Sequence, residues 1–346
     1  MTEITFPELS RTGRAPLRAR IAAAGAYLPD AAVSNAEIAS RYGHSVSPET
    51  IEKILGIAER RVAPKGVSDS DLLAGAAASC LERAKMSVDD LSKILVSRYL
   101  GDRLLPMTAA AVQHKLGCKN TVQAIDITGG AHSFLQALFA GACAVESDGL
   151  PVLVVAGGIS NRIADRKNPG TAFYYGDGAA AVLIVPSDTP GFRGSYFFSN
   201  PDFADDETSF RLQDYASDEC RSAQDIEAYY SICRPGDWKK SSDFIKRALS
   251  LTVHHLLSIE QRTAEEVALW ILPEPNIRLR NALVDHLDIP VEKTVSLVRE
   301  YGNTQSASLP LQLAYAFSSG TVRSGDTAML LSIGEGIQGG GVLITL

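Results

Sequence analysis

AIDITGGAHSFLQAL, residues 124–138, is the stretch of the sequence that decides the fold. The largely apolar run at 124–128 predicts a β-strand, and two glycines then lead directly into a helix rich in alanine and leucine. Ala131, His132 and Ser133 therefore lie in the first turn of that helix. Because unpaired amide groups and the helix dipole stabilise negative charge at such a position, this turn is a candidate reactive point.

The same alternation of strands and helices continues along the chain. Apolar runs such as 152–156 predict further strands, and alanine- and leucine-rich stretches such as 71–85 predict helices. Strands that alternate with helices in this way are typical of an α/β protein.

Similar segments recur in the same order about 176 residues further along the chain. Four pairs match: 87–100 with 263–276, 112–127 with 283–298, 133–157 with 309–333, and 176–185 with 339–346. Matches that keep their order indicate a duplication. We therefore expect two similar halves, residues 1–186 and 187–346, with the boundary near 186–194.

The repeat of the strand-to-helix turn is EYGNTQSASLP, residues 300–310, which presents Asn303 in a comparable position. A polar segment at about 199–240, rich in Asp, Ser and Tyr, has no counterpart of that length in the first half. Such an insertion either covers a site on the sheet or is a surface excursion.

Composition and charge exclude several classes of protein. The 346 residues are 45% hydrophobic, which allows one or two domains with full cores. No apolar run approaches the roughly 18 to 20 residues that cross a bilayer, and residues 1–16 lack the layout of a signal peptide. We therefore expect no membrane contact and a cytoplasmic location. A net charge of -7 without a dense basic stripe argues against nucleic acid as a partner.

The cysteines, glycines and basic residues give little indication of a metal site or a resident cofactor. Five scattered cysteines without a C-x-x-C pair predict buried thiols and no metal site. The glycines at 176–178 lead into a strand, so they predict a tight turn, and no nucleotide cofactor is implied. Arg60 and Arg61 lie close to Lys65 in the sequence. This cluster either contacts one anionic ligand, as candidate cofactor-binding residues, or is solvated surface.

Six motifs resemble segments of the ketoacyl-acyl-carrier-protein synthase III family. They are GIAERRVAP at 56–64, DITGGAHSF at 126–134, GDGAAAVLI at 176–184, WILPEPN at 270–276, YGNTQSAS at 301–308 and SIGEGIQGGG at 332–341. The resemblance covers roughly residues 20–346. It implies an α/β protein with the thiolase-like, five-layered α/β/α/β/α fold, built from two duplicated halves.

Members of that family attack an acyl thioester with a cysteine, and use a histidine and an asparagine to activate and stabilise the carbanion or oxyanion. On the matching motifs, Ala131 stands at the cysteine position, Glu274 at the histidine position and Asn303 at the asparagine position. Alanine cannot form an acyl-enzyme. The aromatic residue and the arginine that hold the adenine of coenzyme A correspond to Thr50 and Ile54, whereas a carrier protein would not need that adenine slot.

Three interpretations of the site stay open. The chain is an engineered Cys→Ala form of an active enzyme, a natural variant that transfers an acyl group without a covalent step, or a degenerate subunit that partners an active homologue. In the second, Glu274 is the general base and Asn303 polarises the thioester carbonyl. His132 and Ser133 serve either catalysis or packing. Successive residues of a helix are rotated by about 100°, so these two side chains point in other directions than that of Ala131.

The resemblance implies an acyltransferase or condensing enzyme of polyketide, fatty-acid or other secondary metabolism. Its expected partners are an acyl thioester on acyl carrier protein or coenzyme A and a small-molecule acceptor. The expected assembly is a homodimer, or a heterodimer with a homologue.

Overall fold

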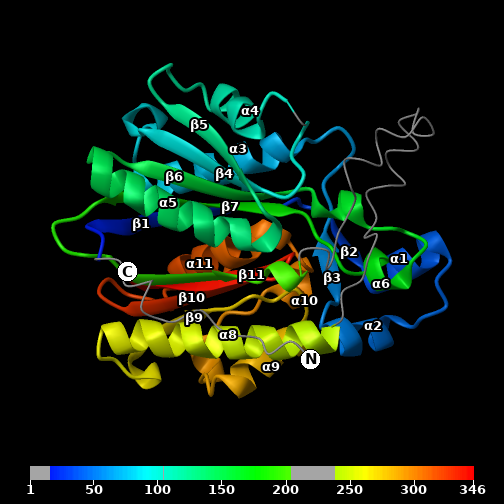
Figure 1. Ribbon diagram of the computed structural model, residues 1–346. Coiled ribbons are helices and arrows are strands. Elements are labelled where there is room, and N and C mark those ends of the chain that lie inside the picture. The colour runs from blue at the N-terminus through cyan, green and yellow to red at the C-terminus, as the bar shows by residue number, and fades with distance from the viewer. Residues whose placement is uncertain (1–15, 104, 204–237) are drawn as a thin grey trace.

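The computed structural model describes residues 16–103, 105–203 and 238–346. Two β-sheets lie face to face, with helices between them and on both outer faces (Figure 1). The greater part of the expected insertion at about 199–240, namely 204–237, lies outside the described residues.

The sheet of the first half has five strands in the order β1-β7-β6-β4-β5. They are β1 (Ala19–Tyr27), β7 (Gly178–Pro186), β6 (Val152–Gly158), β4 (Lys93–Arg98) and β5 (Gln123–Thr128). β7 is antiparallel to both β1 and β6, whereas β6, β4 and β5 run parallel. Every residue of β6 is buried, as expected for a central strand covered on both faces.

The sheet of the second half repeats this arrangement in the order β8-β11-β10-β9. Its strands are β8 (Phe192–Ser199), β11 (Gln338–Thr345), β10 (Thr327–Gly334) and β9 (Leu269–Ile271). β11 is antiparallel to both β8 and β10, and β10 runs parallel to β9. In the place of β5 there is only a parallel bridge between Trp270 and Thr294. The two sheets therefore match as a duplication predicts, but the strand expected in the repeat 283–298 is reduced to that bridge.

Six helices form three layers around the sheets. Two lie between the sheets, and two cover each outer face (Figure 1). They are α5 (Ser133–Asp148) and α11 (Ser308–Ser319) between the sheets, α3 (Asp69–Ala84) and α4 (Thr108–Lys115) on the first, and α8 (Trp238–Ile259) and α9 (Ile277–His286) on the second. The expected five-layered α/β/α/β/α fold is confirmed.

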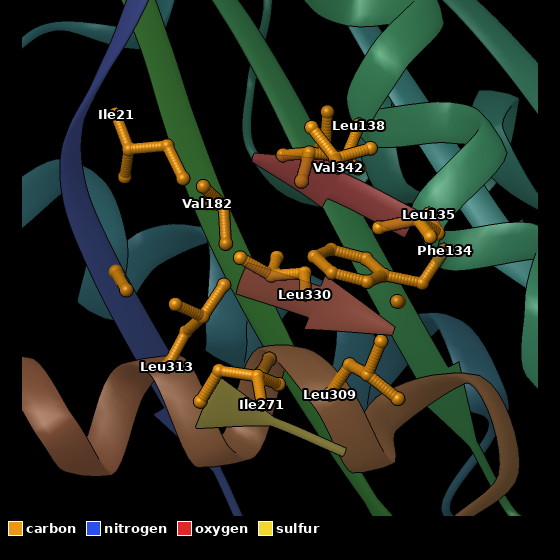
Figure 2. Close-up of a cluster of buried hydrophobic side chains, with 14 of the residues drawn as sticks. Ile21, Phe134, Leu135, Leu138, Val182, Ile271, Leu309, Leu313, Leu330 and Val342 are labelled. Carbon is orange, nitrogen blue, oxygen red and sulfur yellow. The ribbon is translucent and has the colours of Figure 1, made fainter. Parts of the chain in front are cut away.

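The central layer is held by apolar contacts with both sheets. Phe134 and Leu138 of α5 belong to one buried cluster with Val182 of the first sheet and with Leu330 and Val342 of the second (Figure 2). Burial of each such side chain stabilises the fold by about 1.5 to 3 kcal/mol. These contacts fix the start of α5, which follows the predicted reactive turn.

A small group of elements packs beside the layers around Val33, Ile38, Ile51 and Phe173. Ser34 and Ser47 cap its first two helices through their side-chain oxygens, which accept bonds from the first-turn amides. Its elements are β2 (Ala32–Ser34), α1 (Asn35–Tyr42), α2 (Pro48–Leu55), β3 (Glu59–Arg61) and α6 (Pro169–Ala172), and the short helix α10 (Val298–Tyr301) adjoins β3.

None of the helices in the described part of the chain has the length and apolar character needed to cross a membrane. Nor do those residues place three or more His, Cys, Asp or Glu side chains where they could hold a metal ion. The expectation of buried thiols holds for Cys80, whereas Cys118 and Cys143 are partly exposed.

Candidate active site

A cavity of about 480 Å³ is lined by residues of both halves. Ala131, Glu274 and Asn303, which the sequence motifs single out, all lie on its wall. Tyr99 and Leu309 add aromatic and aliphatic surface. The cavity therefore joins the three predicted site residues to an apolar space that can take an acyl chain.

Ala131 lies where the predicted strand-to-helix turn forms. β5 ends at Thr128, and Gly129 and Gly130 follow with φ of 151° and 61°, a region that favours glycine. The 3-10 turn η3 (Gly130–His132) then leads into α5. The turn thus presents the amide of Ala131 at the start of a helix, but it carries no nucleophilic side chain at that position.

Glu274 follows β9 and is only 4% exposed. Its Oε1 accepts a hydrogen bond from the N–H of Leu297 at 2.9 Å, and its Oε2 has no partner among the described residues. Burial raises the pKa of Glu274 to about 7, although bonds from Leu297 and Ser296 and the charge of Arg280 favour the ionised form. A carboxyl group with this pKa can take up or release a proton near neutral pH.

Asn303 lies two residues before the start of the turn η9 (Gln305–Ala307), which leads into α11. Its Oδ1 accepts a hydrogen bond from the N–H of Gln305 at 2.9 Å. Its backbone N–H donates to the carbonyl of Tyr174 at 2.9 Å, and its carbonyl accepts from Gly176 at 3.1 Å. Because Oδ1 is held in this way, the NH₂ group of Asn303 is the end that can donate to a ligand.

His132 and Ser133, which the sequence analysis placed among the candidate catalytic residues, do not line the cavity. His132 is 1% exposed and packs edge-on against Phe197, with ring centroids 5.7 Å apart. Burial lowers the pKa of His132 to about 4, so its ring is neutral. Ser133 Oγ donates to the carbonyl of Gly130 at 2.7 Å and lies 2.7 Å from Ser97 Oγ. Of the two roles left open, the geometry supports packing.

Arg60, a candidate cofactor-binding residue from the sequence, does not line the cavity. It is fully buried, and its guanidinium donates to the carbonyls of Val33 and Phe173 and to Oδ1 of Asn35. A guanidinium enclosed by protein oxygens in this way does not face an external anion.

Arg61, the other half of that assignment, is partly exposed but does not line the cavity either. Its Nη1 donates to the carbonyl of Asp30 at 3.1 Å, and its guanidinium carbon lies 5.9 Å from the ring centroid of Tyr301. The pair therefore does not act together at the cavity.

Glu335 is a residue of the cavity that the sequence analysis did not single out. It lies in the loop between β10 and β11, and its Oε2 accepts a hydrogen bond from the N–H of Ala131 at 3.4 Å. Burial raises the pKa of Glu335, while hydrogen bonds, including those from Ala131 and Gln305, favour the anion. The feature of the sequence that could have indicated Glu335 is that it is an acidic residue within the glycine-rich segment SIGEGIQGGG. The sequence does not show that this loop reaches the turn of the other half.

The two positions predicted to lack the adenine contacts both lie in α2. Thr50 Oγ1 is 3.1 Å from Ser47 Oγ at the start of that helix. Ile54 is 37% exposed and forms part of the cavity wall. An aliphatic side chain here offers neither the stacking surface nor the charge of the residues expected in the family.

Two duplicated α/β halves, with a site where their strand-to-helix turns meet, define the thiolase-like class of condensing enzymes. Residues 125–201 match the family model for 3-oxoacyl-[acyl-carrier-protein] synthase III, and residues 257–346 match the model for its C-terminal part.

Curated relatives extend the match to nearly the whole chain. β-Ketoacyl-[acyl-carrier-protein] synthase III of Wolbachia pipientis wMel is 31% identical over 330 residues, which cover 94% of this chain and 98% of the relative. The enzyme of the same name from Neisseria gonorrhoeae (strain NCCP11945) is 31% identical over 328 residues, with the same coverage. The chain belongs to the 3-oxoacyl-[acyl-carrier-protein] synthase III family of ketosynthase III-like condensing and acyl-transferring enzymes.

Solved structures agree with this assignment. The priming β-ketosynthase of the R1128 polyketide pathway has a TM-score of 0.85 and 26% identity, covering 96% of this chain and 98% of that one. The 3-oxoacyl-[acyl-carrier-protein] synthase III of Aquifex aeolicus VF5 has a TM-score of 0.82 and 26% identity, covering 95% and 100%.

Proposed function

We propose that this chain transfers an acyl group from a thioester to a small-molecule acceptor without forming an acyl-enzyme. The observation that carries the proposal is the convergence of Ala131, Glu274 and Asn303 on one cavity. Alanine provides no nucleophile, but the other two side chains provide a proton acceptor and a hydrogen-bond donor. This is chemistry for direct attack of the acceptor on the thioester.

The transfer requires one bond to form and one to break. The acceptor's oxygen, nitrogen or carbon attacks the thioester carbonyl, and Glu274 takes up the proton that the acceptor loses. The NH₂ group of Asn303 donates to the carbonyl oxygen as negative charge develops on it. The carbon–sulfur bond then breaks, and the thiolate leaves with a proton from solvent or from the protonated Glu274.

We infer that the thioester is carried by acyl carrier protein rather than by coenzyme A. The relatives named above are synthases of acyl-carrier-protein thioesters by name, and the solved priming ketosynthase belongs to a polyketide pathway. Thr50 and Ile54 supply no aromatic or cationic surface for an adenine ring. A carrier protein has no adenine, so its binding does not need the contacts that Thr50 and Ile54 cannot make.

We also propose that a second copy of the chain pairs with strand β5. Among the described residues, β5 pairs only with β4, so its other side is an open sheet edge. Ile125 in this strand is 40% exposed. An open edge with an exposed apolar side chain favours pairing with another strand, and a homodimer would cover it.

Thiol release from acyl-carrier thioesters in the presence of acceptors tests the proposed function. Glu274→Gln should lower the rate at least about a hundredfold, because the amide cannot take up the acceptor's proton. Glu292→Gln, which changes an exposed glutamate, should leave the rate unchanged. Equal rates in Glu274→Gln and the unmodified chain, with both folded by circular dichroism, would remove Glu274 from the mechanism.

A further inference from the structure

Glu335 brings a carboxyl group from the second half to the start of the central helix of the first. Besides the 3.4 Å bond from the N–H of Ala131, a methyl group added at Gly130 would come within 1.8 Å of Glu335 Oε2. The carboxyl group therefore packs directly against the turn. It lies where the helix start offers its amide groups to negative charge.

Gln305, at the start of the corresponding helix turn in the second half, holds the same carboxyl group. A hydrogen bond from the Gln305 side chain favours the ionised form of Glu335. The donor is therefore Nε2 of Gln305. Gln305 is 4% exposed, and its backbone N–H is bonded to Asn303. Its Oε1 has no partner among the described residues. Groups from both helix starts thus fix the position of the carboxylate.

The charges on the cavity wall are unevenly distributed. Two carboxyl groups, Glu274 and Glu335, line it. Among the described lining residues, Arg278 is the sole lysine or arginine, and it is exposed to solvent. Arg280 is buried near Glu274 but does not line the cavity, and its guanidinium donates to Asn281 and Thr294. A negative charge brought in beside Ala131 would therefore meet two carboxyl groups, which repel it once they are ionised, without a buried cation on the described wall.

We propose that Glu335 is a specificity-determining residue that fills the anion-accepting start of α5 with the protein's own carboxyl group. The cavity then accepts acyl groups without a carboxylate and rejects those that carry one. The inference rests on the proposed acyl transfer, because it names the class of acyl thioester used at the same site. Once Glu335 is ionised, it repels a second carboxylate more strongly at this partly buried position than it would in water, whereas a neutral aliphatic acyl group can contact Leu309 and Ile333.

Two unreactive ligands of matched shape test this inference by calorimetry at about pH 8.5. They are the amide analogues, with nitrogen in place of the thioester sulfur, of malonyl-pantetheine and isovaleryl-pantetheine. The unmodified protein should bind the isovaleryl analogue more than about tenfold tighter than the malonyl analogue. Glu335→Gln and Glu335→Gly should bring the two affinities within about threefold, whereas Glu335→Asp, which keeps the charge, should retain a preference. Thermal unfolding of each variant checks that it is folded.

Equal binding of the two analogues by the unmodified protein would overturn the inference, and so would binding of neither. A preference that survives unchanged in Glu335→Gln and Glu335→Gly would assign the discrimination to another group and overturn the role of Glu335. Because the analogues do not react, this result is separate from thiol release. Failure of turnover would contradict the proposed function while leaving the measured preference intact.

Discussion

At the scale of the residue, the site lacks the thiol of a covalent mechanism but contains two carboxyl groups. Ala131 removes the thiol that a covalent mechanism needs, whereas Glu274 and Glu335 bring carboxyl groups to the same cavity. Burial raises the pKa of both, and that of Glu274 reaches about 7. Groups with pKa values displaced toward neutrality are typical of acid–base chemistry, although buried structural carboxyls show the same effect.

Glu274 should impose a pH-dependent cost on folding. Its pKa rises from 4.5 to about 7 in the folded protein, so the folded chain binds more protons between these values. Its effect on stability is therefore most favourable below pH 4.5 and declines as the pH rises through about 7. The decline amounts to about 3 kcal/mol.

Urea unfolding of the unmodified chain and of Glu274→Gln at about pH 4.5 and about pH 8 measures this effect. The variant should gain stability relative to the unmodified chain only at the higher pH, because glutamine keeps an acceptor for Leu297 but carries no charge. Glu292→Gln serves as the exposed control. An equal difference at the two pH values would contradict the raised pKa.

At the scale of the element, the proposed functions depend on one edge strand and two helix starts. The turns before α5 and α11 present Ala131 and Asn303 to the cavity, and the loop between β10 and β11 adds Glu335. Strand β5, which precedes the first of these turns, is also the open edge of its sheet. Pairing at this edge would therefore place a partner close to the strand that leads into the active-site turn.

Ile125→Lys should convert the proposed homodimer to a monomer, because the charge would be buried at the paired edge. Sedimentation velocity at several protein concentrations measures the change. Leu150→Lys replaces another exposed apolar residue, outside β5, and should leave the dimer intact. A dimer that persists in Ile125→Lys would exclude this edge, and a monomeric unmodified chain would exclude the homodimer itself.

The elements were largely predictable from the sequence because their signals are local. The glycine pair between an apolar run and an alanine-rich stretch predicted the turn at Ala131, and repetition predicted its counterpart at Asn303. The roles of Arg60 and Glu335 were not predictable in this way. Burial of Arg60 depends on Asn35 and Phe173, and placement of Glu335 depends on contact between the two halves. Neither contact leaves a pattern in the chain.

At the scale of the whole molecule, duplication explains why a single cavity can gather residues from distant segments. Each half supplies a sheet and a central helix, and the central helices share one apolar core between the sheets (Figure 1). Packing of these helices brings their starting turns into contact with the same cavity. Both turns could therefore change their side chains, as at Ala131, without loss of the core that positions them.

Intact-protein mass spectrometry combined with thiol release can decide whether acyl transfer proceeds without a covalent enzyme intermediate. The unmodified chain and Ala131→Cys are each incubated with a panel of acyl-carrier thioesters and acceptors. Thiol release by the unmodified chain, without any added mass, is the expected result. An acyl adduct on the unmodified chain would contradict it, and so would thiol release restored only in Ala131→Cys together with an adduct on that variant.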